Sequence, residues 1–220
     1  MSNMSLILHG YWRSSAAYRV RIALNLKELE YRQVTHDLRT GAQCKAEYRE
    51  LAPIGLVPAL ETDDGQVLTQ SLAILEWLEE RYPDPPLLPA NAPARSAVRA
   101  MAYIVACDIH PINNLRVLKG LREDLGAGEV AVRDWIARWV GEGFAALETM
   151  ASQNGGRFCF GDTPTLADCC LIPQIYNARR FDVALDAYPT LLRIDANCQT
   201  FDAFAKAAPE VQPDAGGPAT

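Results

Sequence analysis

Two serines stand where a short β-like run gives way to a helix-like run, and their hydroxyls could take part in chemistry. Ser14 and Ser15 follow residues 6–10 and stand at the start of a helical pattern over 15–26. A serine at a helix start is often an N-cap, worth about 1 kcal/mol. Its hydroxyl and the first N–H groups of the helix can also stabilise an anion. One serine suffices as a cap, so the other remains for an anion such as the thiolate of a ligand.

Two further stretches could bind a ligand through backbone or hydroxyl groups. Gln70 and Ser71 open another helical run, where Ser71 is either a cap or part of a carboxylate site. Val57–Pro58 precedes a β-like run, where a proline is restricted to an edge or an irregular start. A cis bond there would turn the valine backbone outward toward an extended peptide, although only about 5–6% of X–Pro bonds are cis.

Polar residues interrupt a long helical pattern at 108–114, which contains His110, Pro111 and Asn114. Pro111 should kink or end the helix there. The interruption is either one wall of a cleft or an element boundary with incidental caps, and His110 alone does not decide between them.

Three arginines are candidates for binding the carboxylates of a ligand: Arg13, Arg116 and Arg180. A guanidinium offers planar, bidentate donors that match a carboxylate. Each of these arginines, taken alone, could equally be a solvated surface charge.

Thr165 and Asp168 have the T-x-x-D spacing of a capping box and directly precede an apolar run. We therefore predict that Asp168 is a structural acid, even if it proves to be buried.

A proline-rich segment, 81–93, separates two kinds of pattern. Before it, β-like and helical runs alternate in the order β-α-β-α-β-β-α, with an Asp-Gly hairpin signal at residues 64–65. This order predicts a thioredoxin-like α/β domain. The runs lie at 6–10, 15–26, 31–35, 44–51, 57–61, 66–68 and 71–81.

Beyond the prolines only helical patterning occurs, in runs near 94–125, 129–151, 165–178 and 189–207. We therefore expect a thioredoxin-like domain over 4–84, a linker over 85–93, an all-helical domain over 94–212 and a disordered tail over 213–220.

Composition excludes several classes of function. The net charge of −6 argues against nucleic-acid and anionic-membrane partners. No apolar run approaches the roughly 20 residues that span a bilayer, and the first residues lack a secretory signal, so we expect a cytoplasmic protein. The six cysteines form no C-x-x-C pair and have no histidine at zinc-ligand spacing, so we expect no metal.

The sequence as a whole resembles the zeta class of the glutathione S-transferases, which includes maleylacetoacetate and maleylpyruvate isomerases. The resemblance is carried, in order, by RSSAAYRVRIALNLK, VPAL, QSLAILEWLEERYP, LLP, DIHPINN, GDTPTLADCCLIPQ and ARRFDVALDAYP. It departs from the class signature S-S-C-x-x-R-V-R-I-A-L at Ala16, where the class has cysteine. The serines, rather than that cysteine, are therefore the better candidates for stabilising the thiolate.

The resemblance implies a thioredoxin-like glutathione domain, an all-helical second domain and a homodimer. It implies a glutathione-dependent cis–trans isomerase of an acidic, small-molecule maleyl keto-acid, with glutathione as cofactor. The implied catalytic residues are Ser14, Ser15 and Arg13; the implied glutathione contacts are Val57, Pro58, Gln70, Ser71, His110, Asn114 and Gln43; the implied substrate contacts are Arg13, Arg116 and Arg180.

Two alternatives remain open from the sequence. One is a glutathione transferase or dehalogenase that acts on small electrophiles, which a broad apolar pocket would favour. The other is a non-catalytic binding module of the same fold, for which retention of Ser14, Gln70, Ser71 and the arginines would be unnecessary.

Overall fold

The computed structural model describes residues 6–154 and 156–216, and the chain divides into two compact units. The first unit contains the described residues up to Pro86 together with those from Thr200 onward. The second unit runs from Leu87 to Gln199. The two units are described separately below.

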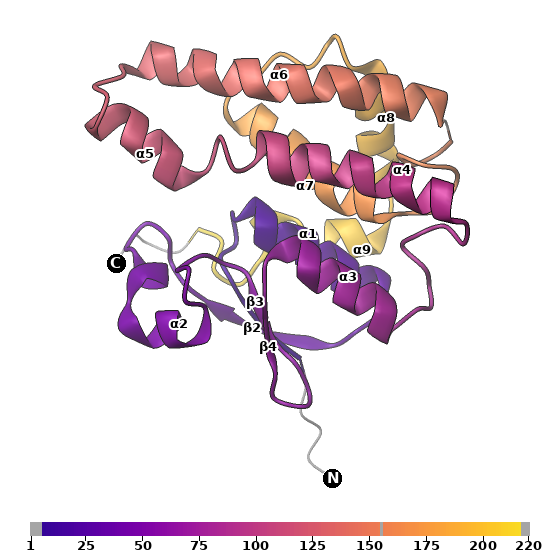
Figure 1. Ribbon diagram of the computed structural model, residues 1–220, viewed down its shortest axis with the longest axis horizontal. Coiled ribbons are helices and arrows are strands. Elements are labelled where there is room, and N and C mark those ends of the chain that lie inside the picture. Colours follow the sequence, from indigo (N-terminus) through magenta and orange to yellow (C-terminus); the bar gives the residue numbers. More distant parts are fainter. Residues whose placement is uncertain (1–5, 155, 217–220) are drawn as a thin grey trace. The chain divides into compact units, whose positions relative to one another are not determined.

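The first unit contains a four-stranded sheet of order β2-β1-β3-β4 (Figure 1). The strands are β1 (Leu6–Gly10), β2 (Tyr31–Thr35), β3 (Ala59–Glu61) and β4 (Val67–Thr69). β1 runs parallel to β2 and antiparallel to β3, and β3 and β4 form an antiparallel hairpin. The hairpin turns at Gly65, whose φ of 83° favours glycine. The element order confirms the predicted thioredoxin-like arrangement.

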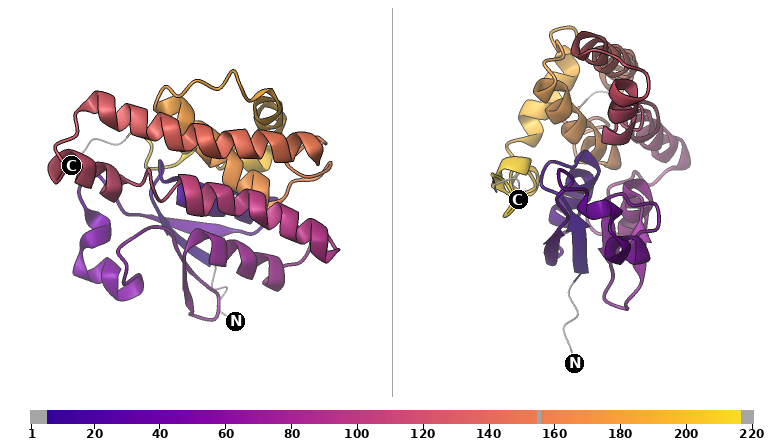
Figure 2. Two further views of the ribbon diagram at one scale, coloured as in Figure 1. Left: turned by 45° about the horizontal axis from the view of Figure 1, so that its top comes forward. Right: turned by 90° about the vertical axis from the view of Figure 1, so that its left-hand side faces the viewer.

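Helices cover both faces of this sheet. Along the strands, Leu8 and Leu60 pair and are fully buried on one face, while His9 and Ala59 pair on the other. The helices of this part are α1 (Ser15–Leu26), η1 (Ala42–Cys44), α2 (Ala46–Leu51) and α3 (Ser71–Arg81). α1 packs against α3, whereas Tyr48 of α2 packs on Ala59. Figure 2 shows the unit from two further directions.

Two predicted elements of this unit have different bounds in the structure. The helix predicted over 44–51 begins at Ala46 as α2, because Lys45, which separates it from η1, has extended backbone (φ −67°, ψ 151°). The strand predicted from residue 57 begins at Ala59, after Pro58, which has no N–H for a ladder hydrogen bond.

A buried lysine ties the ends of α1 and α3 together. The Lys27 ammonium donates to Glu79 Oε2 at 2.9 Å and to the carbonyls of Tyr82 (2.6 Å) and Pro85 (3.0 Å). The Lys27 side chain is fully buried and that of Glu79 nearly so. This cluster fixes the end of α3 where the chain leaves the unit.

The end of the chain returns to the first unit, which corrects the predicted assignment of 94–212 to the helical domain. This segment contains α9 (Asp202–Ala205) and η3 (Pro209–Val211). Arg21 Nε donates to the Ala207 carbonyl and Asn25 Nδ2 to the Ala203 carbonyl, each at 2.9 Å. Burial lowers the pKa of Arg21 to about 10, so the guanidinium needs the acceptors that this segment brings.

The predicted disordered tail, 213–220, is also corrected in part. Residues 213–216 are described, and Asp214 accepts a hydrogen bond from the Trp12 N–H at 2.9 Å. A second bond, from Gln33 Nε2, reaches the other Asp214 oxygen at 3.1 Å. The end of the tail, 217–220, lies outside the described residues.

The described residues of the second unit are helical and contain no strand, as the sequence predicts. The helices are α4 (Ala92–Tyr103), the π-helical η2 (Ile104–Ile109), α5 (Leu115–Glu123), α6 (Glu129–Gln153), α7 (Leu166–Arg180) and α8 (Pro189–Cys198). The run predicted over 94–125 is broken by η2 and by the turn that contains Pro111. The run predicted over 189–207 ends at Cys198, and its remainder belongs to the first unit.

The predicted capping box is confirmed at the start of α7. Asp168 is fully buried and accepts bonds of 2.8 Å from the Cys159 N–H, the Thr165 N–H and the Thr165 hydroxyl. Burial raises the pKa of Asp168, and the hydrogen bonds from Cys159 and Thr165 oppose that rise. Asp168 is therefore structural, as predicted.

Across the described residues, none of the helices is long and apolar enough to cross a membrane. The same residues contain no group of three or more histidine, cysteine or acidic side chains arranged to hold a metal ion.

Candidate active site

The serine pair lies where the sequence places it, at the start of α1. Ser14 is the N-cap, and its Oγ accepts a bond of 3.3 Å from the Ala17 N–H. This cap uses a lone pair of the oxygen and leaves the hydroxyl proton to be donated elsewhere. Capping and anion binding are therefore compatible at Ser14. Ser15 is the first residue of the helix and is buried, as is Ala16.

The loop before Ser14 is held from both sides at Trp12. The Trp12 N–H donates to Asp214, and the Trp12 carbonyl accepts from Arg21 Nη2 at 2.9 Å. Arg13 is half-buried, and its guanidinium lies 5.1 Å from the centre of the Trp12 ring. The loop that carries Arg13 and Ser14 is thus fixed by a helix and by the end of the chain.

The Val57–Pro58 peptide bond is cis and leads into β3. Val57 is half-buried and packs against the cluster that Tyr48 and Ala59 form. The Tyr48 hydroxyl donates to the Leu56 carbonyl at 2.9 Å, one residue before Val57. α2 therefore supports this loop directly.

Gln70 and Ser71 stand at the start of α3 and differ in environment. Gln70 is exposed and has φ 67° and ψ 114°, a backbone conformation that costs a non-glycine residue about 1–3 kcal/mol. Strain of this kind concentrates at binding sites. The Ser71 hydroxyl is buried and accepts from Arg19 Nη1 at 3.2 Å.

Gln43, in η1, has a buried side-chain oxygen, Oε1, that lacks a hydrogen-bond partner among the described residues. Its backbone carbonyl lies close to Gly55, where an added Cβ would come within 3.1 Å of it. Gln43 is thus an unsatisfied acceptor on the segment that leads to Val57.

The second unit holds the remaining predicted residues. His110 and Asn114 are half-buried in the turn between η2 and α5. Asn114 caps α5, because its Oδ1 accepts from the Arg116 N–H at 3.2 Å, and the Arg116 side chain is exposed. Arg180 ends α7, is exposed, and lies 4.3 Å from the centre of the Phe181 ring. The structure places His110 and Asn114 in one turn and Arg116 at the start of the helix that follows it, whereas Arg180 lies at the end of α7.

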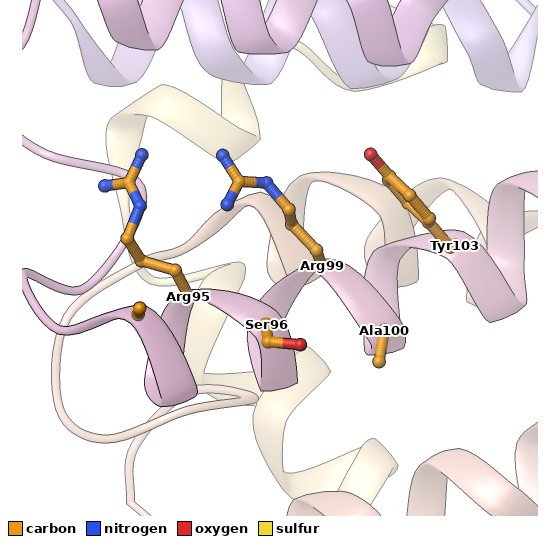
Figure 3. Close-up of a pocket in the computed structure, with 6 residues that line it drawn as sticks. Arg95, Ser96, Arg99, Ala100 and Tyr103 are labelled. Carbon is orange, nitrogen blue, oxygen red and sulfur yellow. The ribbon is translucent and has the colours of Figure 1, made fainter.

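A separate hollow of about 410 Å³ lies along α4 (Figure 3). Arg95, Arg99 and Tyr103, four residues apart, point to the same side of this helix. Ala92, Ser96 and Ala100 complete the lining. None of the predicted glutathione or substrate residues lines this hollow, so we do not place the active site there.

Two residues that support the site were not predicted from the sequence. From its sequence context, Arg19 is predicted to be a packing or solvent-facing side chain of the helix. In the structure it is 2% exposed and donates a hydrogen bond to the Ser71 hydroxyl. Asp214 falls in the predicted tail, where nothing in the local pattern signals a contact with Trp12. Only the long-range folding of the chain brings these groups to the site.

The fold is that of the glutathione S-transferases. The family model for the N-terminal domain of glutathione S-transferase matches residues 13–81, and the model for the C-terminal domain matches residues 133–210. The chain belongs to this family.

Within the family, similar proteins are zeta-class isomerases. The chain is 51% identical over 209 residues to a maleylpyruvate isomerase of Ralstonia sp., covering 94% of this chain and 98% of the other. It is 51% identical over 205 residues to a maleylacetoacetate isomerase of Rhizobium meliloti, covering 93% and 96%. A holo structure of a bacterial zeta-class maleylpyruvate isomerase superposes with a TM-score of 0.93 at 50% identity, covering 96% and 100%.

Proposed function

We propose that this chain is a glutathione-dependent isomerase that converts a maleyl keto-acid, maleylacetoacetate or maleylpyruvate, to its fumaryl form. The observation that carries the proposal is Ser14, whose hydroxyl proton is available at the N-terminus of α1. Such a site stabilises a thiolate that a ligand brings, because the first N–H groups of a helix have no acceptor within it. The full-length similarity to isomerases of both substrates supports the same activity.

The residues present fit glutathione as cofactor. Gln43 offers a buried acceptor that has no partner within the described part of the chain, and Gln70, which is exposed, has a strained backbone at the start of α3. A related maleylacetoacetate isomerase from Anaeromyxobacter dehalogenans, 47% identical, has been crystallised with glutathione in its active site. We assign the cysteinyl part of glutathione to Val57, the γ-glutamyl part to Gln70 and Ser71, and further contacts to His110 and Asn114.

Bound glutathione supplies a thiolate that adds reversibly to the cis double bond of the substrate, which allows rotation about that carbon–carbon bond. A thiol of ordinary pKa, about 8.5, is mostly protonated at pH 7. The Ser14 hydroxyl and the α1 N-terminus favour the thiolate, and each pKa unit of lowering is worth about 1.4 kcal/mol. Ser15 supports the same end of the helix.

Arginine side chains position the acidic substrate in this proposal. Arg13, Arg116 and Arg180 bind its carboxylates, and their charge stabilises the negative charge that develops on the carbonyl oxygen in the transition state. The reaction begins and ends with the same atoms, so it consumes no glutathione.

The test is a spectrophotometric assay of both maleyl keto-acids, with and without catalytic amounts of glutathione, on the wild type and Ser14→Ala. We expect turnover that requires glutathione and falls at least about a hundredfold in the variant, as when one transition-state donor is removed. Asn91→Ala is the matched control. Asn91 caps α4 through a 2.9 Å bond from the Ala94 N–H, so its loss costs similar stability without touching the site.

Lack of turnover on both compounds, with glutathione still bound, would exclude the isomerase. A product that retains glutathione would instead indicate a conjugating transferase or dehalogenase. Binding of glutathione without chemistry on any small electrophile would favour a non-catalytic module.

We also propose that the protein is a cytoplasmic homodimer. The dimer rests on the family resemblance, and light scattering of the purified protein should give twice the mass of one chain. The location rests on the cysteines: all six are free thiols, as expected in a reducing compartment.

A further inference from the structure

A cluster of titratable side chains lies under α2, apart from the residues assigned above. His9 Nδ1 lies 2.9 Å from His36 Nε2, and His9 Nε2 lies 2.5 Å from Glu61 Oε1. The sheet order explains the meeting, because β1, which carries His9, lies between β2 and β3. His36 directly follows β2, and Glu61 ends β3. His9 is 9% exposed, and His36 and Glu61 are half-buried.

The two distances define which protons the cluster can hold. A carboxylate only accepts, so His9 Nε2 must carry a proton toward Glu61. Only one proton fits between His9 Nδ1 and His36 Nε2. The cluster is therefore intact when both rings are neutral, or when they share one extra proton. When both rings are charged, two N–H groups face each other and this bond is lost.

An aromatic contact connects the cluster to the proposed glutathione site. The rings of His36 and Tyr48 lie 4.2 Å apart between centres, and His9 also lies near Tyr48 at 6.3 Å. The Tyr48 hydroxyl holds the Leu56 carbonyl, next to Val57. Tyr48 thus contacts the His36 ring and also holds the carbonyl one residue before Val57.

We propose that His9, His36 and Glu61 form a proton-responsive support that, through Tyr48, sets the affinity of the Val57 loop for glutathione. In this arrangement Tyr48 is a positioning residue. The inference rests on the proposed function, because it assigns glutathione to Val57. While the hydrogen bond between His9 and His36 exists, the loop that contains Val57 stays in the conformation that binds glutathione. When both rings are charged, this hydrogen bond is lost and the loop is no longer held in that conformation.

The surrounding groups determine the sign of the pH effect. Among the described residues, Glu61 faces His9 from β3, and Tyr48 faces both rings from α2. Burial raises the pKa of Tyr48, so it stays neutral. Asp37, beside His36 in the chain, forms an ion pair with Arg39 at 2.7 Å.

Burial, and then the charge of His9, lowers the pKa of His36 below its usual 6.5. A lowered folded-state pKa means that the native arrangement is favoured above pH 6.5 and is lost as the pH falls through the lower value. Glutathione affinity should therefore weaken on the acidic side of pH 6.5.

Binding of S-methylglutathione, measured by calorimetry between pH 5.5 and 7.5, tests the proposal. The methyl group removes the titration of the glutathione thiol, so the protein supplies the pH dependence. We expect the dissociation constant to rise about threefold to tenfold from pH 7.5 to 5.5, since release of one proton changes affinity at most tenfold per pH unit. Circular dichroism at each pH confirms that the protein is folded.

Two variants and one control isolate the cluster. His36→Phe keeps an aromatic ring against Tyr48 but cannot titrate, and Tyr48→Phe keeps the ring but loses the bond to Leu56. Both should flatten the pH dependence. Asp186→Ala, an exposed substitution outside the cluster and outside the assigned glutathione contacts, should preserve the ratio between the two dissociation constants.

A measurement on the unaltered protein provides a second test. Nuclear magnetic resonance can follow the three histidine rings during a pH titration. The coupling between proton binding and ligand binding is reciprocal. Saturating S-methylglutathione should therefore lower the pH midpoint of the His36 titration, and the size of this shift should match the loss of ligand affinity that protonation causes. Binding without pH dependence, or a His36 midpoint that ligand does not move, overturns this inference alone. Absence of binding at every pH overturns both it and the proposed function.

Discussion

Replacing Asp168 by asparagine should destabilise the protein strongly although it removes no carbon atom. Both carboxylate oxygens of Asp168 are in use: one accepts from the Cys159 N–H, and the other from the N–H and hydroxyl of Thr165. Asparagine has one acceptor oxygen, and its amide nitrogen cannot accept. Its best orientation keeps the two bonds from Thr165 and turns the amide toward the buried Cys159 N–H.

The magnitude follows from these bonds. A buried N–H without an acceptor costs about 1–3 kcal/mol, and the two remaining bonds lose the strength that a charged acceptor gives, about 1 kcal/mol each. Relief from burying a charge offsets part of this, so we expect about 3 kcal/mol in all. For a chain of this size the melting temperature should fall by about 6–12 °C.

Thermal unfolding followed by circular dichroism measures this effect. Thr165→Val is the comparison, because it removes one hydroxyl from the same box and should cost about 1 kcal/mol. A loss below 1 kcal/mol for Asp168→Asn, or equal losses for the two variants, would refute the view that both oxygens of Asp168 hold the start of α7.

Two further predictions concern the first unit. Lys27→Met should lower the free energy of unfolding, measured by urea denaturation, by about 3–5 kcal/mol, because it leaves the buried Glu79 without its cation. The double variant Lys27→Met, Glu79→Met should recover much of this stability. Equal losses in the single and double variants would contradict the prediction. Asp214→Ala should weaken glutathione binding by up to about tenfold in calorimetry, since an anchor of the Trp12 backbone is lost. The exposed substitution Asp186→Ala is its control, and equal affinities in the two variants would count against the anchor.

Local patterns predicted the elements whose signals lie within a few residues. The bounds of 6–10, 15–26, 31–35 and 71–81 agree with the structure, because strand alternation, helical spacing and terminal serines act over one or two turns. The capping box at Asp168 was predictable for the same reason. The break at Lys45 was not, because nothing in the residue types there opposes a continuous helix.

The site was predictable in its residue types but not in its supports. Ser14 and Gln70 lie at helix starts, as their sequence context indicates. The bonds of Arg19 to Ser71 and of Asp214 to Trp12 join residues far apart in the chain. The cluster of His9 with Glu61 likewise depends on strand register, which no local pattern specifies.

The return of the chain end to the first unit has a consequence for synthesis on the ribosome. Residues 200–216 are translated after the whole of the second unit, yet they carry the carbonyls that satisfy Arg21 and Asn25. Arg21 and Asn25 of the nascent first unit therefore lack these acceptors while residues 87–199 of the second unit are added. A fragment ending at Pro86 would lack these acceptors permanently. The order of translation thus makes completion of the first unit one of the last events in maturation.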